Sequence, residues 1–186
     1  MRVISGSAKG RRLNMYEGQH TRPTTDKTKE SLFAMLQFEI PDARFLDLYA
    51  GSGAIAIEAL SRGADTAVLV EKSKKAAACI RYNLEKTGLA ERASLHVQDV
   101  FQAINELGAA EDRFDVIFLD PPYDSNLENR TVRAVMNAGI LKPEGLLVVE
   151  SAADTEISGT GYVVEKERTY GITKLTFLRY RKDGEL

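Results

Sequence analysis

The sequence predicts an α/β fold of the doubly wound, Rossmann-like type, with a mostly parallel sheet of seven strands and helices on both faces. Two observations favour this fold. From Ala43 onward, short apolar segments alternate with amphipathic ones, a pattern that requires right-handed crossovers over a parallel sheet. The last two apolar segments are separated only by residues 169–172 (TYGI), which predicts an antiparallel C-terminal hairpin.

The predicted elements follow in a regular order. Residues 22–36 are expected to form the first helix, because side chains that suit a buried face recur at helical spacing after Pro23 and after the candidate caps Thr24, Thr25 and Asp26. These side chains are Thr28, Leu32, Met35 and Leu36. The predicted strands are 44–49, 66–71, 93–99, 115–120, 146–151, 161–168 and 173–180. The helices between them are predicted at 52–62, 73–87, 100–107 and 126–138.

The start of the chain differs from the rest in charge. Residues 1–30 hold seven lysines and arginines against three acids, whereas the whole chain of 186 residues has a formal charge of −2. Residues 2–5 (RVIS) and 11–15 (RRLNM) could pair as a small hairpin. A basic end can be a solvated surface or a contact for nucleic acid. We expect residues 1–24 to form a basic extension and residues 25–186 to form one globular domain.

Composition excludes several classes of protein. No apolar run reaches the roughly 18 residues of a membrane helix, and the opening residues contain no signal-peptide segment, so we expect a cytoplasmic protein that does not contact membranes. The only cysteine is Cys79 and the only histidines are His20 and His96. Neither a disulfide framework nor a Cys/His zinc site can be built from these three residues, and we expect no metal.

Acidic residues close the first three predicted strands of the sheet. In such sheets, ligands bind beyond the carboxyl ends of the strands. Asp47 is followed by a turn that contains Gly51 and Gly53, Glu71 is placed to accept two hydrogen bonds from a ribose diol, and Asp99 lies within reach of an adenine amino group. The expected nucleoside site comprises Asp47, Tyr49, Gly51, Ser52, Gly53, Glu71, Lys72, Asp99 and Val100.

Two other interpretations of these residues remain open. Gly51, Gly53 and Ala56 also satisfy the glycine fingerprint of dinucleotide-binding enzymes, with Glu71 in the position that binds the ribose. A nicotinamide oxidoreductase would therefore have a similar sequence pattern. Asp47 and Asp99 could also simply cap the turns that follow them. The next strand distinguishes among these possibilities.

The strand predicted at 115–120 ends in Asp120, Pro121, Pro122 and Tyr123. The exocyclic amine of a base is a poor nucleophile, because its lone pair is delocalised into the ring. The Asp120 carboxylate and the Pro121 carbonyl can accept the two amino hydrogens, and Asp120 can take up the released proton. The prolines hold these acceptors rigidly, and Tyr123 offers a face for a flipped base. The residues predict an amino-methyltransferase, although Asp-Pro-Pro-Tyr is also plausible turn chemistry.

Several motifs together resemble a known family. DLYAGSGAIAIEALSRGA, VEK, QDV and DPPY are similar to the successive motifs of class I methyltransferases, which use S-adenosylmethionine. RVISGSAKGRRL and TRPTTDKTKESLFAML resemble the opening of the RsmD family, bacterial 16S ribosomal RNA guanine-N2 methyltransferases. The resemblance covers nearly the whole chain, and its opening segments are the specific part. One departure is Ile172, where a polar residue is expected.

The resemblance implies a substrate and a set of contacts. The substrate would be guanine 966 of 16S rRNA, presented by the small ribosomal subunit or by an assembly intermediate, and the enzyme is expected to be a monomer. The basic opening would contact the RNA through Lys9, Arg11, Arg12, Arg22 and Lys27. Other hypotheses are an adenine-N6 or other amino-methyltransferase on DNA or another RNA, and a non-catalytic RNA-binding domain.

Overall fold

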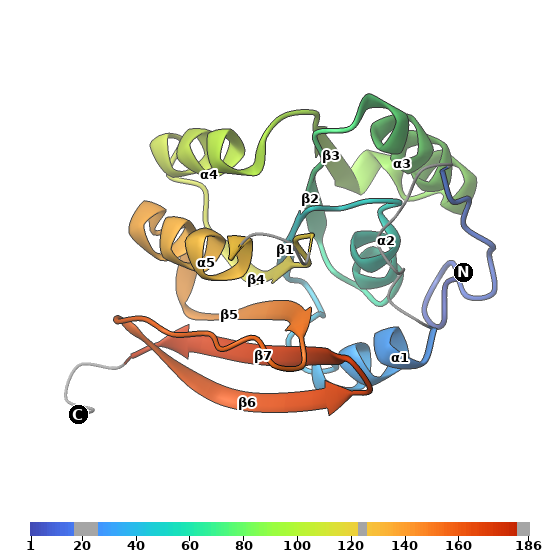
Figure 1. The fold of residues 1–186 in the computed structure, drawn as a ribbon. Helices are drawn as coiled ribbons and strands as arrows, with labels where there is room; N and C mark the ends of the chain where they lie inside the picture. Colours follow the sequence, from blue (N-terminus) through green and yellow to red (C-terminus); the bar gives the residue numbers. More distant parts are fainter. Residues whose placement is uncertain (17–25, 123–125, 182–186) are drawn as a thin grey trace.

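A computed structural model describes residues 1–16, 26–122 and 126–181. Its centre is a seven-stranded sheet with the order β3-β2-β1-β4-β5-β7-β6 (Figure 1). The strands are β1 (Arg44–Leu48), β2 (Thr66–Val70), β3 (Ala93–His96), β4 (Phe114–Leu119), β5 (Leu141–Ala152), β6 (Tyr162–Tyr170) and β7 (Thr173–Tyr180). The first five strands are parallel, and β7 pairs antiparallel with both β5 and β6. The predicted mostly parallel sheet with an antiparallel C-terminal hairpin is confirmed.

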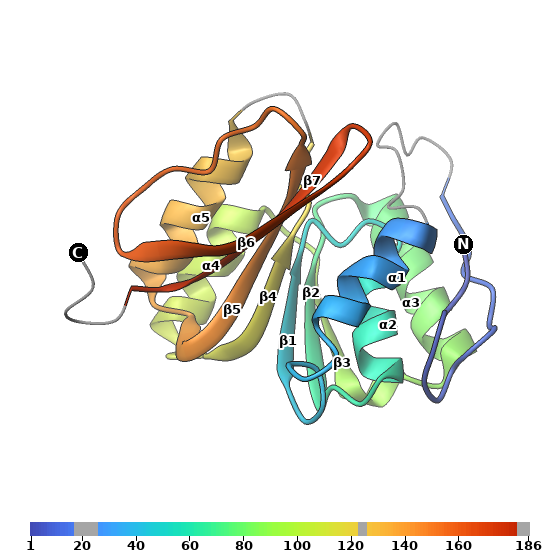
Figure 2. The same ribbon diagram turned by 90° about the horizontal axis from the view of Figure 1, so that it is seen from below.

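Helices cover both faces of this sheet. They are α1 (Asp26–Met35), α2 (Ala54–Ser61), α3 (Lys74–Thr87), α4 (Val100–Ala109) and α5 (Leu127–Ala138), with a short 3-10 turn, η1, at Ala90–Arg92. Figure 2 shows α1, α2 and α3 on one side of the sheet and α4 and α5 on the other. Each side has its own buried apolar cluster. The central strands therefore carry apolar side chains on both faces of the sheet, as a sheet covered by helices on both sides requires.

The sheet reverses its winding between β1 and β4, which pair in parallel with Leu48 opposite Leu119. Helices α2 and α3, which follow β1 and β2, cover one face of the sheet. Helices α4 and α5, which flank β4 in sequence, cover the other. The carboxyl ends of β1, β2, β3 and β4 meet at the same edge of the sheet. This edge is where doubly wound sheets bind ligands.

The predicted boundaries differ from the structure mainly in three places. Strand β3 ends at His96 instead of residue 99, because Asp99 is the N-cap of α4. Strand β5 begins at Leu141 instead of residue 146, because a register shift between Phe114 and Val116 accommodates residues 142–145, whose Lys-Pro-Glu-Gly sequence resembles a turn. Helix α1 begins at Asp26, and the proposed preceding residues Pro23, Thr24 and Thr25 lie outside the described ranges. Leu36 is buried just after that helix ends.

The first 16 residues lie across the surface of α2 and α3, and we call this segment the strap. The predicted hairpin is present but short: Arg2 and Arg12 form one antiparallel bridge, and the Val3 amide donates to the Arg11 carbonyl beside it. The strap's apolar side chains Val3, Ala8 and Leu13 are buried in the same cluster as α1 and α2. The division of the chain at residue 24 stays a prediction. Within the described ranges, the helices are all too short or too polar to cross a membrane.

Candidate active site

The turn between β1 and α2 contains two glycines in the left-handed region of backbone space. Gly51 has φ 58° and Gly53 has φ 77°. A β-carbon on Gly53 would also lie 3.3 Å from Leu69 and 3.4 Å from Ile80, which leaves little room for any side chain. The turn therefore packs closely against β2 and α3, and glycine suits both its backbone conformation and the space at position 53.

Asp47 lies beneath this turn, fully buried within β1. Its carboxylate accepts a hydrogen bond from the amide of Ala56, at 3.2 Å, which joins the strand to the first turn of α2. Burial raises the pKa of Asp47 to about 8, the Ala56 hydrogen bond acts in the opposite direction, and the negative charge of Glu71 raises the pKa further. A cation bound nearby would be stabilised by this carboxylate and would favour its ionised form.

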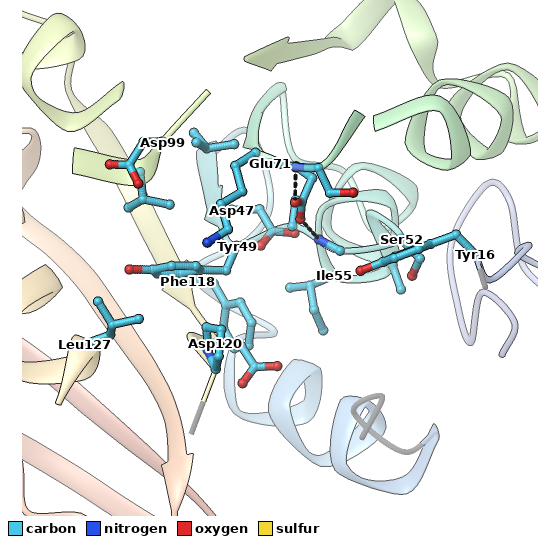
Figure 3. A pocket seen from close by; sticks show the side chains of 18 of the residues that line it. Tyr16, Asp47, Tyr49, Ser52, Ile55, Glu71, Asp99, Phe118, Asp120 and Leu127 are labelled. Atoms are coloured by element: carbon cyan, nitrogen blue, oxygen red, sulfur yellow. Dashed lines mark hydrogen bonds between the residues drawn. The ribbon is translucent and has the colours of Figure 1, made fainter. Parts of the chain in front are cut away.

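Glu71, directly after β2, is held by two backbone amides. One carboxylate oxygen accepts from Gly51, at 2.9 Å, and the other accepts from Ser73, at 2.7 Å. These bonds fix the carboxylate between the glycine turn and the start of α3 (Figure 3). Each oxygen keeps a second acceptor direction for a ligand hydroxyl.

Asp99 has the capping role that the sequence left open, and it also lines the cavity. Its carboxylate accepts from the amide of Phe101, at 2.9 Å, as the N-cap of α4. The side chain is exposed, so an oxygen remains accessible at the sheet edge. Of the neighbouring predicted residues, Val100 is buried and Lys72 is exposed, and both line the same cavity.

Tyr49 connects the two halves of the site. It has φ 67°, an uncommon conformation for a residue with a side chain, and its hydroxyl shares a hydrogen bond of 2.7 Å with Thr131 of α5. Burial raises the pKa of its hydroxyl, so the group stays protonated at neutral pH. The side chain is thereby tied to the helix that follows the Asp-Pro-Pro segment.

Asp120 follows β4 at the same edge and is half-buried. Its pKa is raised well above the ordinary value, first by burial and then by the negative charges of Glu150, Asp47 and Glu128. Pro121 is buried, and the exposed Pro122 lines the cavity with Asp120. Tyr123 lies outside the described residues, so its proposed stacking role stays a prediction.

One cavity of about 370 Å³ joins the glycine turn to Asp120 (Figure 3). The sequence prediction missed part of its wall. Most of the missed residues lie within or beside the motifs but have small or apolar side chains that suggest no hydrogen bond to a ligand, whereas Met1, Tyr16 and Leu127 come from other segments. The missed lining residues are Met1, Tyr16, Ala50, Ala54, Ile55, Val70, Ser73, Phe101, Phe118 and Leu127. Gly53 and Pro121 are adjacent to this wall in sequence but are not among the residues that form it.

The predicted RNA contacts lie on the strap and on α1. Lys9, Arg11, Arg12 and Lys27 are exposed, and Arg22 lies outside the described ranges. Arg11 also donates a hydrogen bond of 2.6 Å to the carbonyl of Lys86 near the end of α3, so its guanidinium is partly committed to the fold. Across the described part of the chain, no three His, Cys, Asp or Glu side chains come together as a metal site.

Comparisons with known proteins agree with this arrangement. The chain is 38% identical over 186 residues to YlbH of Bacillus subtilis, described as a candidate rRNA methyltransferase, with 99% of this chain and 100% of that protein covered. It is 35% identical to Ribosomal RNA small subunit methyltransferase D of Escherichia coli, over 100% of this chain and 91% of that protein. A solved structure of YhhF from Escherichia coli, described as a candidate methyltransferase, superimposes with a TM-score of 0.86 at 31% identity, covering 97% of each chain.

The strand order and the glycine turn define a class I methyltransferase fold. A family model described as Conserved hypothetical protein 95 matches residues 1–179. The chain belongs to this family, which is the RsmD family that the opening segments resemble.

Proposed function

We propose that this protein transfers a methyl group from S-adenosylmethionine to the exocyclic N2 of a guanine in 16S rRNA. The observation that carries the proposal is the single cavity that brings the acids around the glycine turn together with Asp120. The family and the names of the relatives support an rRNA substrate. The exposed basic side chains of the strap give the RNA backbone a surface to contact.

The cavity suits S-adenosylmethionine in charge and in hydrogen bonding. Glu71 would accept from the ribose hydroxyls, and Asp99 would accept from the adenine amino group. The buried Asp47 would stabilise the positive charge of the bound molecule. When bound, S-adenosylmethionine supplies an electrophilic methyl group on a sulfonium.

The residues after β4 would activate the amine. The Asp120 carboxylate and the Pro121 carbonyl accept the two amino hydrogens and direct the nitrogen lone pair toward the methyl carbon. The nitrogen–carbon bond forms as the carbon–sulfur bond breaks, the bond electrons stay on sulfur, and the amino proton passes to Asp120. The raised pKa of Asp120 improves its capacity to take that proton near neutral pH.

The choice of guanine, and of position 966, rests on the family. An adenine-N6 methyltransferase would use the same donor and a similar acceptor segment. A transfer assay with tritium-labelled S-adenosylmethionine on small subunits that lack the modification, followed by nucleoside analysis, tests the proposal. We expect N2-methylguanosine, and label in another base would favour the alternative.

Binding of S-adenosylhomocysteine separates this proposal from a nicotinamide enzyme. A ligand that binds only the folded state raises its apparent thermal stability. We expect S-adenosylhomocysteine to raise the unfolding temperature and NAD to leave it unchanged. The opposite pattern would overturn the proposal.

A further inference from the structure

The buried side chain of Asn83 connects the strap to the glycine turn. Asn83 is 0% exposed in the middle of α3. Its carboxamide oxygen accepts from the amide of Asn14, at 2.8 Å, and its nitrogen donates to the carbonyl of Asn14, at 3.0 Å. The same nitrogen donates to the carbonyl of Ser52, at 3.0 Å. One amide group therefore binds the strap and the turn at the same time.

The strap reaches the cavity from this anchor. Tyr16 is two residues beyond Asn14 and lines the cavity, as does Met1 at the other end of the strap. Figure 3 shows Tyr16 on the opposite side of Glu71 and Ser52 from Asp99. The pKa of the Tyr16 hydroxyl is raised by burial and by the charges of Glu71 and Cys79, so this hydroxyl remains a donor. The strap is thus part of the cavity wall.

Further contacts hold the rest of the strap rigidly on α1 and α2. Glu58 is fully buried and accepts from the amides of Ile4, at 2.8 Å, and Ser5, at 3.0 Å. The Ser61 hydroxyl accepts from Ala8, at 2.9 Å. Gly6 lies so close to α2 that a β-carbon on it would lie 1.7 Å from the carbonyl oxygen of Ser61. These contacts define one docked position for the strap.

We propose that Asn83 is a positioning residue that couples the strap to the donor site, so that Tyr16 closes the cavity over the bound donor. The inference rests on the proposed function, because the donor is S-adenosylmethionine. The strap also carries the exposed residues Lys9, Arg11 and Arg12. Because binding free energies are reciprocal, RNA that binds the docked strap more tightly than an undocked strap also tightens donor binding.

Limited proteolysis tests the coupling without any RNA. Trypsin cuts after lysine and arginine, and the exposed Lys9, Arg11 and Arg12 become susceptible when the strap opens locally. We expect saturating S-adenosylhomocysteine to slow cleavage at these sites several-fold in the wild-type protein. Mass spectrometry of the N-terminal fragments identifies each cut. Equal cleavage with and without the ligand would overturn the proposal.

Two variants separate the coupling from general stability. Asn83→Ala removes the shared amide, and Tyr16→Ala removes the wall residue while leaving the anchors intact. We expect both to weaken S-adenosylhomocysteine binding in calorimetry, by roughly tenfold or more for Asn83→Ala, as loss of a buried hydrogen-bond partner predicts. Asn83→Ala should also abolish the ligand's protection of the strap from trypsin.

Thr87→Ala is the matched control. Thr87 is buried on the same helix, and among the described residues its hydroxyl donates to the carbonyls of Asn83 and Leu84, both within that helix. We expect this variant to lose stability without losing affinity or protection. If wild-type protein does not bind S-adenosylhomocysteine, the proposed function fails. If the wild-type protein binds and both Asn83→Ala and Tyr16→Ala bind equally well, only the coupling is wrong.

Discussion

The carboxyl groups of Asp120 and Glu150 belong to neighbouring positions on adjacent parallel strands. Leu119 of β4 pairs with Val149 of β5. Asp120 follows Leu119, and Glu150 follows Val149. Phe118 and Val148, two residues earlier on each strand, both face the apolar cluster on the side of α1. Because side chains alternate along a strand, Asp120 and Glu150 face that same side. Glu150 is buried, and its negative charge raises the pKa of Asp120.

Replacing Glu150 with Gln should move the pH dependence of methyl transfer. Asp120 must be ionised to accept the proton, so the single-turnover rate should rise with pH through its raised pKa. Gln keeps the capacity for hydrogen bonds but removes one of the negative charges that raise this pKa. We therefore expect the rising limb of the profile to move to lower pH.

The described groups whose charges raise the pKa of Asp120 are Glu150 on β5, Asp47 on β1 and Glu128 on α5. Ser151→Ala is a suitable control, because Ser151 is the next buried residue of β5. A profile that is unchanged in Glu150→Gln would show that the two carboxylates are not coupled in the reaction.

Asp120→Ala should remove catalysis and preserve donor binding. The substitution deletes the proton acceptor, and losses of this kind are typically 10²- to 10⁴-fold. The residues that surround the glycine turn are unchanged, so calorimetry should give nearly the wild-type affinity for S-adenosylhomocysteine. Normal transfer by this variant would favour a turn-forming role for the Asp-Pro-Pro segment.

Asp47→Asn should change how stability depends on pH. The pKa of Asp47 is about 8 in the folded protein and 3.8 in its ordinary state, so the folded protein holds this proton more tightly than the unfolded chain does. The contribution of this bound proton to the free energy of unfolding is fully present below about pH 4 and is lost as pH rises toward about 8. Asn stays neutral, so its contribution to the free energy of unfolding does not change over this pH range.

Thermal unfolding of both proteins between about pH 5 and about pH 9 measures this difference. The unfolding temperature of Asp47→Asn, relative to wild type, should rise by several degrees as pH increases. Donor binding should weaken in the same variant, because the charge that favours a cation is gone. A constant difference in unfolding temperature across the range would mean that Asp47 is ionised in the folded protein.

Lys9→Ala and Arg12→Ala should weaken RNA binding without changing the free energy of unfolding. Both side chains are exposed on the strap. Each phosphate contact that is lost should reduce the slope of the logarithm of affinity against the logarithm of salt concentration by about one. Filter binding to 16S rRNA at several salt concentrations measures the slope. The exposed Lys75 of α3 provides a matched charge control, and an equal effect from Lys75→Ala would refute a specific role for the strap.

The sequence predicted the features that depend on local pattern. Strand–helix alternation gave the sheet, and the glycines at 51 and 53 marked the turn, because positive φ favours glycine. The role of Asp99 as an N-cap was considered as an alternative, and the structure shows this capping together with access to the cavity.

Features that depend on packing between distant segments were not predicted. Lys29 reads as a solvated lysine, yet it is fully buried, with its ammonium 3.3 Å from Glu58. Tyr16 and Asn83 carry no motif. Asn83 binds the strap across 69 residues of chain, and Tyr16 lines a cavity formed mostly by distant residues. Periodicity describes neighbours on one element and contains no information about which polar side chains will be enclosed by another.

The position of Met1 has a practical consequence for how the protein is produced. Its side chain lines the cavity, and its carbonyl accepts a hydrogen bond from Leu13, at 3.1 Å. An affinity tag fused before Met1 would start beside the donor pocket and compete with its ligand for space. A purification handle placed after β7, or one removed without residual residues, should yield the protein with its native ligand affinity.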